Sequence, residues 1–270
     1  MTALITGATE GIGRAFALAL AAEGHTVTAV ARTERHLRAL MTELGPGGSD
    51  GEHEYLVADL ATPDGMRTVA DALTATPYDL LINNAGHARP GPFADTPLDQ
   101  ALPALHLNCE AVVALAHAFL AAARHGAALV NVASTLAFAP QPGQAVYSAT
   151  KAFVASFSEA LWYEQRPRGV YVMALCPGPT ATRPGLHTDI PAALVRTPEA
   201  VVAAALTALR RRRRPTVVPG RANALLAAVT RYLPRTTTLS LLADGPGPLF
   251  RKDLLAVPCR PGPWPARCRD

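Results

Sequence analysis

Two residues with the chemistry of a proton-transfer pair, Tyr147 and Lys151, stand four positions apart in a long apolar segment. An i, i+4 spacing places both side chains on one helical face, so that an ammonium group can sit beside the phenol. A free tyrosine has a pKa of about 10, and a neighbouring cation favours its phenolate. The spacing therefore predicts that Lys151 lowers the pKa of Tyr147 and makes it a usable general acid or base. A helix-surface pair without a chemical role is the competing interpretation, but Ser134 ends a predicted strand 13 residues earlier.

A glycine-rich turn follows the first predicted strand. The sequence Thr6-Gly7-Ala8-Thr9-Glu10-Gly11-Ile12-Gly13 leads directly into an apolar helix. Glycines let the backbone turn tightly and approach a pyrophosphate, whose charge the N-terminus of the helix would meet. Such turns also occur for packing reasons alone, but the position directly after the first strand favours a dinucleotide site.

The elements that must position these residues alternate between short β-like runs and longer helical segments. Strands are predicted at 3–6, 26–30, 54–58, 79–83, 128–133, 170–175 and 216–219, and helices at 12–23, 65–75, 101–123, 147–165 and 198–213. This alternation implies right-handed crossovers and a parallel sheet covered by helices on both faces. We expect an α/β fold with a three-layer, doubly wound, Rossmann-like sheet of about seven strands, and ligands at the carboxyl ends of the strands.

Further motifs stand in a fixed order along residues 1 to 190. TGxxxGIG resembles the nucleotide-binding signature of the short-chain dehydrogenase/reductase family, and Asn83-Asn84-Ala85-Gly86 is similar to its NNAG motif. Asp59-Leu60 resembles the adenine-side acid, and Pro177-Gly178 resembles the nicotinamide-side turn. The resemblance implies that the cofactor contacts Gly7, Thr9, Glu10, Gly11, Ile12, Gly13, Arg32, Asp59, Leu60, Asn84, Ala85, Gly86, Tyr147, Lys151, Pro177, Gly178, Thr180 and Thr182.

The same resemblance implies roles for four catalytic residues. Ser134 would hydrogen-bond the substrate oxygen, Tyr147 would transfer the proton, and Lys151 would also hold the nicotinamide ribose. Asn108 matches the family's helix-kinking asparagine, which retains a water that links the lysine to solvent. An interior polar residue that caps a distorted helical turn is an equally compatible interpretation of Asn108.

The choice of dinucleotide depends on the end of the second predicted strand, where NAD-preferring relatives carry an acid. Here Ala31 is followed by Arg32, whose guanidinium can bind a 2′-phosphate. We therefore expect NADP(H), although Glu10 stands where many NADP-preferring relatives carry a basic residue.

Length and composition indicate one catalytic domain over residues 1–235 and a Pro/Gly-rich, weakly ordered tail over 236–270. No run of about 18 uncharged apolar residues appears, so we expect no transmembrane segment and a cytoplasmic protein.

The four cysteines lack CxxC spacing, and the histidines on predicted helices lack acid or cysteine partners at ligand spacing. No metal site is therefore predicted.

The chain carries its strongest charge feature at Arg210–Arg214. Nucleic acid or an anionic membrane could be attracted to such a run. We interpret the run instead as the basic C-terminal end of a helix, where cations complement the helix dipole. Because the net charge is only +4, we predict no nucleic-acid partner.

Residues 220–243 resemble the C-terminal helical extension of a bacterial subgroup of the family. This segment could cover the substrate cleft, pack between subunits or touch a membrane surface.

These features together predict an NADP(H)-dependent oxidoreductase, of the class EC 1.1.1, that interconverts a ketone and a secondary alcohol. A hydrophobic ketone or β-ketoacyl compound is the expected substrate, with the loops at 87–97 and 178–200 shaping its site. A non-catalytic NADP(H)-sensing or scaffold protein and an epimerase or dehydratase are the alternatives. The resemblance also implies a homodimer or homotetramer.

Overall fold

The computed structural model describes residues 1–48, 51–182 and 190–243. They contain a seven-stranded sheet in the order β3-β2-β1-β4-β5-β6-β7, in which every neighbouring pair is parallel. The strands are β1 (Thr2–Thr6), β2 (Thr26–Ala31), β3 (Glu54–Val57), β4 (Leu80–Asn83), β5 (Ala128–Val132), β6 (Tyr171–Leu175) and β7 (Thr216–Val217). All seven predicted strands and the predicted parallel sheet are confirmed.

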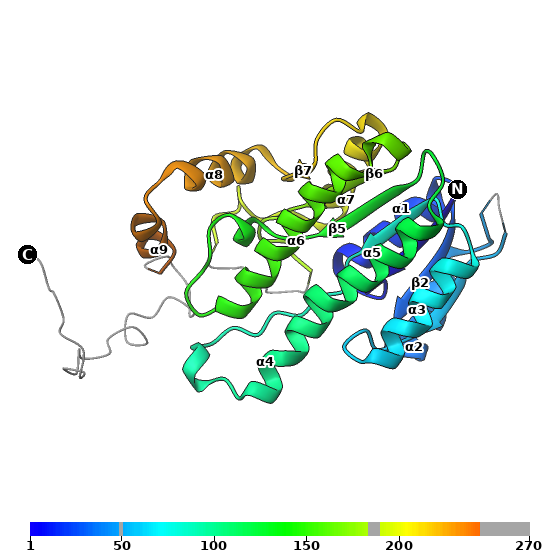
Figure 1. Ribbon diagram of the computed structural model, residues 1–270, viewed down its shortest axis with the longest axis horizontal. Coiled ribbons are helices and arrows are strands. Elements are labelled where there is room, and N and C mark those ends of the chain that lie inside the picture. Colours follow the sequence, from blue (N-terminus) through cyan, green and yellow to red (C-terminus); the bar gives the residue numbers. More distant parts are fainter. Residues whose placement is uncertain (49–50, 183–189, 244–270) are drawn as a thin grey trace, which may run out of the picture.

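Helices cover both faces of the sheet (Figure 1). The main helices are α1 (Gly11–Ala22), α2 (Glu34–Leu44), α3 (Pro63–Ala75), α4 (Leu98–Leu105), α5 (Ala111–Ala122), α6 (Ala145–Glu164), α7 (Pro198–Arg211), α8 (Arg221–Tyr232) and α9 (Arg235–Ala243). Side chains of α1, α2 and α7 share one apolar core with one face of the sheet. Side chains of α3, α5 and α6 pack in the core on the opposite face. The three predicted layers are therefore present.

The strands read as continuous apolar runs because both of their faces are buried. In β1, Ala3 and Ile5 pack under α1 and α2, whereas Leu4 packs under α3 and α5. In β5, Val130 and Leu129 divide between the two cores in the same way. This alternation follows from the two-residue period of a strand whose two faces are both covered by helices.

The sheet reverses its winding direction between β1 and β4. From β1 the chain moves outward through β2 to β3, returns to β4, and then moves outward through β5 and β6 to β7. The loops after β1 and β4 therefore diverge at the carboxyl edge of the sheet. This is where an open α/β sheet forms its ligand crevice.

The predicted helix over 101–123 is interrupted. α4 ends at Leu105, a π-helical turn occupies His106–Glu110, and α5 continues from Ala111. The combined stretch Leu98–Ala122 is, among the described residues, the one helix long and apolar enough to cross a membrane. Half of its most apolar window is buried inside the domain, as is typical of a core helix that packs on a sheet.

Two helices follow the last strand, and α9 extends to Ala243. Residues 236–243 are therefore helical, as the resemblance of 220–243 to a C-terminal helical extension implies, although the predicted domain boundary at 235 assigned them to the tail. The Arg235 side chain bonds to the main body of the domain, and the Thr238 N–H bonds to the carbonyl of Pro234, which starts the helix. The rest of the predicted tail, 244–270, lies outside the described residues.

Candidate active site

The glycine turn after β1 adopts a backbone that side chains would obstruct. Gly7 and Gly11 have φ angles of 64° and 55°, in the left-handed region that favours glycine. A Cβ atom on Gly13 would lie 2.2 Å from the carbonyl oxygen of Gly7. The turn is therefore packed tightly on the first turn of α1, whose N-terminus faces the crevice. This arrangement fits a pyrophosphate group, whose charge an N-terminal helix end stabilises.

The NNAG segment after β4 is fastened to this turn by side-chain hydrogen bonds. Asn84 Nδ2 donates to the carbonyl oxygens of Thr6 at 3.0 Å and Gly7 at 3.2 Å. The Thr6 hydroxyl oxygen accepts from the backbone N–H groups of Asn84 and Ala85, both at 3.0 Å. The two predicted nucleotide motifs are thus held together at the point where the sheet reverses direction.

Gly86 brings the nucleotide crevice next to the predicted catalytic residues. A Cβ atom there would lie 3.3 Å from both Asn108 Oδ1 and Lys151 Nζ. A side chain on Gly86 would therefore crowd both groups, and the glycine lets the loop approach them closely.

The structure brings Ser134, Tyr147 and Lys151 together. Ser134 follows β5, and its hydroxyl lies near enough to the phenol of Tyr147, in the first turn of α6, to influence the pKa of that phenol. Lys151 is buried, and its Nζ lies 5.5 Å from the centroid of the Tyr147 ring and donates a 2.8 Å hydrogen bond to the carbonyl oxygen of Val132. A hydroxyl, a phenol and an ammonium thus lie together beside the glycine turn.

The electrostatics of this cluster differ from the sequence-based expectation. Burial raises the pKa of Tyr147, and the Ser134 hydroxyl is the group's one opposing influence. Lys151 was expected to lower the pKa of Tyr147, but its ammonium is directed at Val132 rather than at the phenolic oxygen. Burial also lowers the pKa of Lys151 to about 8, because a charged amine is poorly solvated in the interior.

Asn108 lies in the π-helical turn and is fully buried. Its Oδ1 accepts from the His87 N–H at 2.8 Å, and its Nδ2 donates to the His87 carbonyl at 2.9 Å and to Thr150 Oγ1 at 3.0 Å. These contacts join the π turn to the loop after β4 and to α6, the helix of Lys151; none of them caps the distorted turn itself. The extra residue of a π turn is what directs this side chain toward α6.

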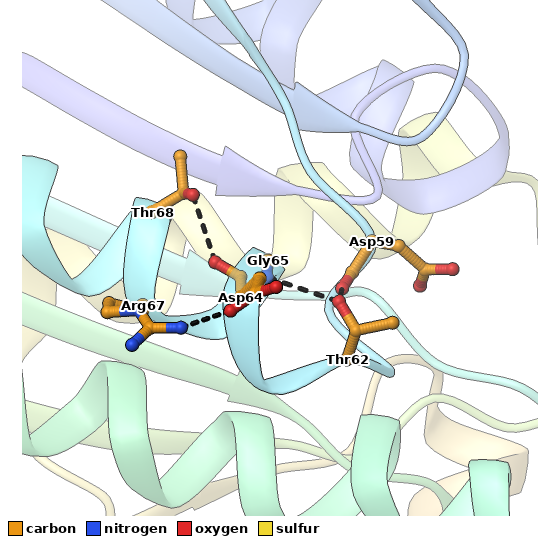
Figure 2. A network of polar contacts seen from close by, with 6 residues as sticks. All are labelled: Asp59, Thr62, Asp64, Gly65, Arg67 and Thr68. Atoms are coloured by element: carbon orange, nitrogen blue, oxygen red, sulfur yellow. Dashed lines mark hydrogen bonds and ion pairs between the residues drawn. The ribbon is translucent and has the colours of Figure 1, made fainter.

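The adenine-side acid, Asp59, lies at the start of the turn that leads into α3. Its Oδ1 accepts from the Ala61 N–H at 3.0 Å, and its carbonyl oxygen accepts from Thr62 Oγ1 at 2.8 Å. Figure 2 shows the contact of Thr62 with the Asp59 carbonyl; Thr62 Oγ1 also caps the helix at the Gly65 N–H, and the Asp59 carboxylate points away from the other residues drawn. Leu60 is buried in the core, so its side chain serves packing.

The remaining predicted cofactor residues flank the crevice. Arg32 follows β2, is exposed, and makes no side-chain hydrogen bond or ion pair with another described residue. The Pro177 carbonyl accepts from the Thr135 N–H at 2.9 Å, and the buried Thr180 hydroxyl donates to the Gly178 carbonyl at 2.9 Å. Thr182 lies against the glycine turn, because a Cβ on Gly11 would come within 2.9 Å of its Cγ2.

Sequence reasoning missed a buried polar chain beneath the catalytic residues. Asn83 Nδ2 donates to Asn131 Oδ1, Asn131 Nδ2 donates to Ser158 Oγ, both at 2.9 Å, and Ser158 donates to the Val154 carbonyl. This chain joins β4 and β5 to α6. An asparagine inside the otherwise apolar strand ALVNV is the signal that could have revealed it.

Sequence reasoning also missed Asn223 of α8. A Cβ on Gly178 would lie 2.6 Å from this side chain, and Asn223 Nδ2 donates to the Leu194 carbonyl at 3.0 Å. α8 therefore supports the segment after β6.

Among the described residues, no group of three or more His, Cys, Asp or Glu side chains is placed to hold a metal ion.

Comparisons with known proteins agree with this geometry. Residues 1–187 match the family model described as short chain dehydrogenase. A very-long-chain 3-oxoacyl-CoA reductase from Phaeosphaeria nodorum is 34% identical over 219 residues, which cover 77% of this chain and 63% of that protein. Human 17-beta-hydroxysteroid dehydrogenase type 3 is 31% identical over 185 residues, covering 67% and 59%. The chain thus spans less than two thirds of the length of these curated relatives.

Solved structures give the same result over more of their length. A short-chain dehydrogenase from Sphingobium yanoikuyae in complex with NADPH superimposes with a TM-score of 0.72 at 34% identity, covering 84% of this chain and 93% of that one. The bulky-bulky ketone specific alcohol dehydrogenase from Comamonas testosteroni also has a TM-score of 0.72, at 31% identity, covering 86% and 98%.

Proposed function

Because this chain belongs to the short-chain dehydrogenase/reductase family, we propose that it is an NADP(H)-dependent oxidoreductase that interconverts a ketone and a secondary alcohol. The observation that carries the proposal is the cluster of Ser134, Tyr147 and the buried Lys151, at the carboxyl edge of the sheet and next to the glycine turn. A phenol in this position can exchange a proton with an oxygen atom bound between Tyr147 and Ser134.

The residues of the crevice fit a bound dinucleotide phosphate. Gly13 leaves no room for a side chain against Gly7, and the N-terminus of α1 offers backbone N–H groups to a pyrophosphate. Asn84 to Gly86 would flank the adenosine ribose, and the exposed guanidinium of Arg32 would pair with a 2′-phosphate. Bound NADPH supplies the hydride in this chemistry. The NADPH complex of the Sphingobium relative supports the choice of nucleotide.

The side chains of the chain itself account for the proton. Burial keeps the pKa of Tyr147 above its ordinary value, so the phenol is protonated near neutral pH and serves as the acid during ketone reduction. Ser134 donates a second hydrogen bond to the carbonyl oxygen and stabilises the negative charge that develops on it. Lys151 orients the nicotinamide ribose. Asn108 holds the start of α6, which carries Tyr147 and Lys151, through its hydrogen bond to Thr150.

A hydrophobic ketone or a β-ketoacyl compound is the proposed substrate. A small recess beside Tyr147 has Arg89, Phe93, Ala104 and Val146 among the residues that line it. The apolar lining suits a hydrocarbon substituent next to the reacting carbonyl. The names of the 3-oxoacyl-CoA reductase and of the bulky-ketone dehydrogenase support the same class. We also propose, from the family resemblance, a cytoplasmic homodimer or homotetramer.

Replacement of Tyr147 by phenylalanine tests the proposal. A panel of ketones is first assayed by loss of NADPH absorbance with the wild type. For any ketone that is reduced, we expect kcat of the Tyr147→Phe variant to fall about 100-fold or more, with unchanged NADPH affinity. Tyr163→Phe, on the exposed face of the same helix, is the matched control. Wild-type turnover by Tyr147→Phe would refute the catalytic assignment. NADPH binding without reduction of any ketone would favour the non-catalytic alternative.

A further inference from the structure

The turn that carries Ser134 is a single hydrogen-bonded unit. It is the short 3-10 helix η3 (Thr135–Ala137), preceded by Ser134 and followed by Phe138. The Ser134 hydroxyl oxygen accepts from the Leu136 N–H at 3.2 Å, and the Phe138 N–H donates to the Thr135 carbonyl at 3.1 Å. A displacement of Phe138 therefore moves Ser134 with it.

Phe138 is held from two directions by arginines of the C-terminal helices. Arg235, the first residue of α9, donates a 2.9 Å hydrogen bond from Nη1 to the Phe138 carbonyl oxygen. Arg231, near the end of α8, has its guanidinium carbon 4.4 Å from the centroid of the Phe138 ring, within the range of a cation–π interaction. Because Phe138 is only 7% exposed, water is a poor substitute for either contact.

The same helices are anchored to α6, the helix of Tyr147 and Lys151. Arg231 Nη2 lies 3.8 Å from Glu159 Oε1 on α6, and that oxygen also accepts from the Thr216 hydroxyl of β7. Ala227 of α8 packs in one apolar cluster with Phe138 and with Val154 of α6. α8 and α9 therefore connect η3 to the helix that carries the proton donor.

We infer that Arg235 and Arg231 are positioning residues for Ser134, and that α8 and α9 form a clamp on the catalytic turn. The inference rests on the proposed function, because the direction of the Ser134 hydroxyl matters for turnover only if it meets the substrate oxygen. Without Arg235 the Phe138 carbonyl loses a charged donor, and η3 can rotate Ser134 away from Tyr147. Small errors of this kind reduce rate more than binding.

Arg235→Ala in the full chain tests the clamp, with NADPH and a ketone that the wild type reduces. We expect kcat to fall about tenfold. This is the effect expected when the displaced Ser134 hydroxyl no longer hydrogen-bonds the charged oxygen of the transition state. NADPH affinity should stay unchanged, and Arg235→Lys, which keeps a charged donor, should recover part of the rate. Arg221→Ala is the matched control, because Arg221 is exposed on α8 and its side chain has no hydrogen bond or ion pair with the described residues. Wild-type kcat in Arg235→Ala would overturn the clamp.

Two further measurements separate positioning from loss of stability. If Arg235 acts through Ser134, adding Arg235→Ala to Ser134→Ala should cause no further loss of kcat, whereas additive losses would overturn the inference. Independently of turnover, amide hydrogen exchange at Leu136 and Phe138 should accelerate in Arg235→Ala and not in Arg221→Ala. Unchanged exchange would refute the clamp. Faster exchange together with a wild type that reduces no ketone would refute the proposed function instead.

Discussion

The side-chain amide of Asn108 donates a 3.0 Å hydrogen bond to the hydroxyl oxygen of Thr150, the residue before Lys151. The Thr150 hydroxyl donates in turn to the carbonyl oxygen of Tyr147 at 2.8 Å. The π-helical turn between α4 and α5 is thereby joined to the first turn of α6. One buried amide thus fixes the distance between the loop after β4 and the residues that would handle the proton.

Replacement of Asn108 by leucine should impair both stability and turnover. The variant leaves the His87 N–H and carbonyl without their partner, so we expect a loss of about 1–3 kcal/mol in the free energy of unfolding, measured in urea. Ketone reduction should fall further than the loss of folded protein explains. Thr150→Val, which removes one of the three contacts, should have a smaller effect. A Leu variant as stable as the wild type would contradict the role given to this amide.

Gly13→Ala should abolish nucleotide binding. The added methyl group would overlap the Gly7 carbonyl at 2.2 Å, so the glycine turn must move away from the helix N-terminus. NADPH fluorescence titration should show loss of saturable binding. Gly24→Ala serves as the control, because Gly24 has a φ of 80° but nothing lies within 4 Å of the Cβ atom that the substitution adds, so it brings backbone strain without a steric overlap. If Gly13→Ala bound NADPH with wild-type affinity, the glycine turn would not be the pyrophosphate site.

Arg32→Asp should change the choice of nucleotide. The variant replaces a cation that can pair with a 2′-phosphate by an anion that repels it, so NADPH affinity should fall roughly 10- to 100-fold. NADH affinity should stay the same or rise, because an acid can accept from the ribose hydroxyls. Both affinities are measured by fluorescence titration, with Arg221→Asp as the remote control. Equal affinities that the substitution leaves unaltered would refute the NADP(H) preference.

Lys151→Met should change how stability depends on pH. Burial lowers the pKa of Lys151 to about 8 in the folded protein, whereas the unfolded chain has the ordinary value near 10.5. Between these values the unfolded state of the wild type binds more protons, so wild-type stability rises with pH relative to the variant. The stability difference should therefore shift toward the wild type by about 3 kcal/mol between pH 7 and pH 11. Urea unfolding curves at several pH values test this prediction. If the free energy of unfolding changed with pH in the same way in both proteins, the lowered pKa of Lys151 would be refuted.

The strands were predictable because a parallel sheet buries both faces, which gives each strand a short apolar run of its own. α2 was not among the predicted helices, although its apolar residues Leu37, Leu40, Met41 and Leu44 recur at helical spacing. The π turn was not predicted either, because its apolar spacing continues that of the helices on both sides. Asn108 was the one residue that indicated a distortion there.

The site was predictable where its residues are neighbours in sequence. The glycine turn, the NNAG segment and the Tyr147–Lys151 pair are each local patterns, and the order of the strands brings them together. The contacts of Arg235 with Phe138 and of Asn223 with Gly178 join distant segments, so no local pattern announces them. Burial, which raises the pKa of Tyr147, depends on the whole fold, whereas the spacing of Tyr147 and Lys151 reveals only the nearby charge.

The burial of Lys151 has a practical consequence for chemical labelling. The chain contains only two lysines, Lys151 and Lys252. Lys151 is 4% exposed and has a pKa of about 8, so its amine is nucleophilic but sterically shielded. Acylating reagents should therefore modify it slowly, at a rate that rises with the opening of the crevice. Mass spectrometry of the single peptide that contains Lys151 then reports cleft opening directly, without the competing signals that a lysine-rich surface would add.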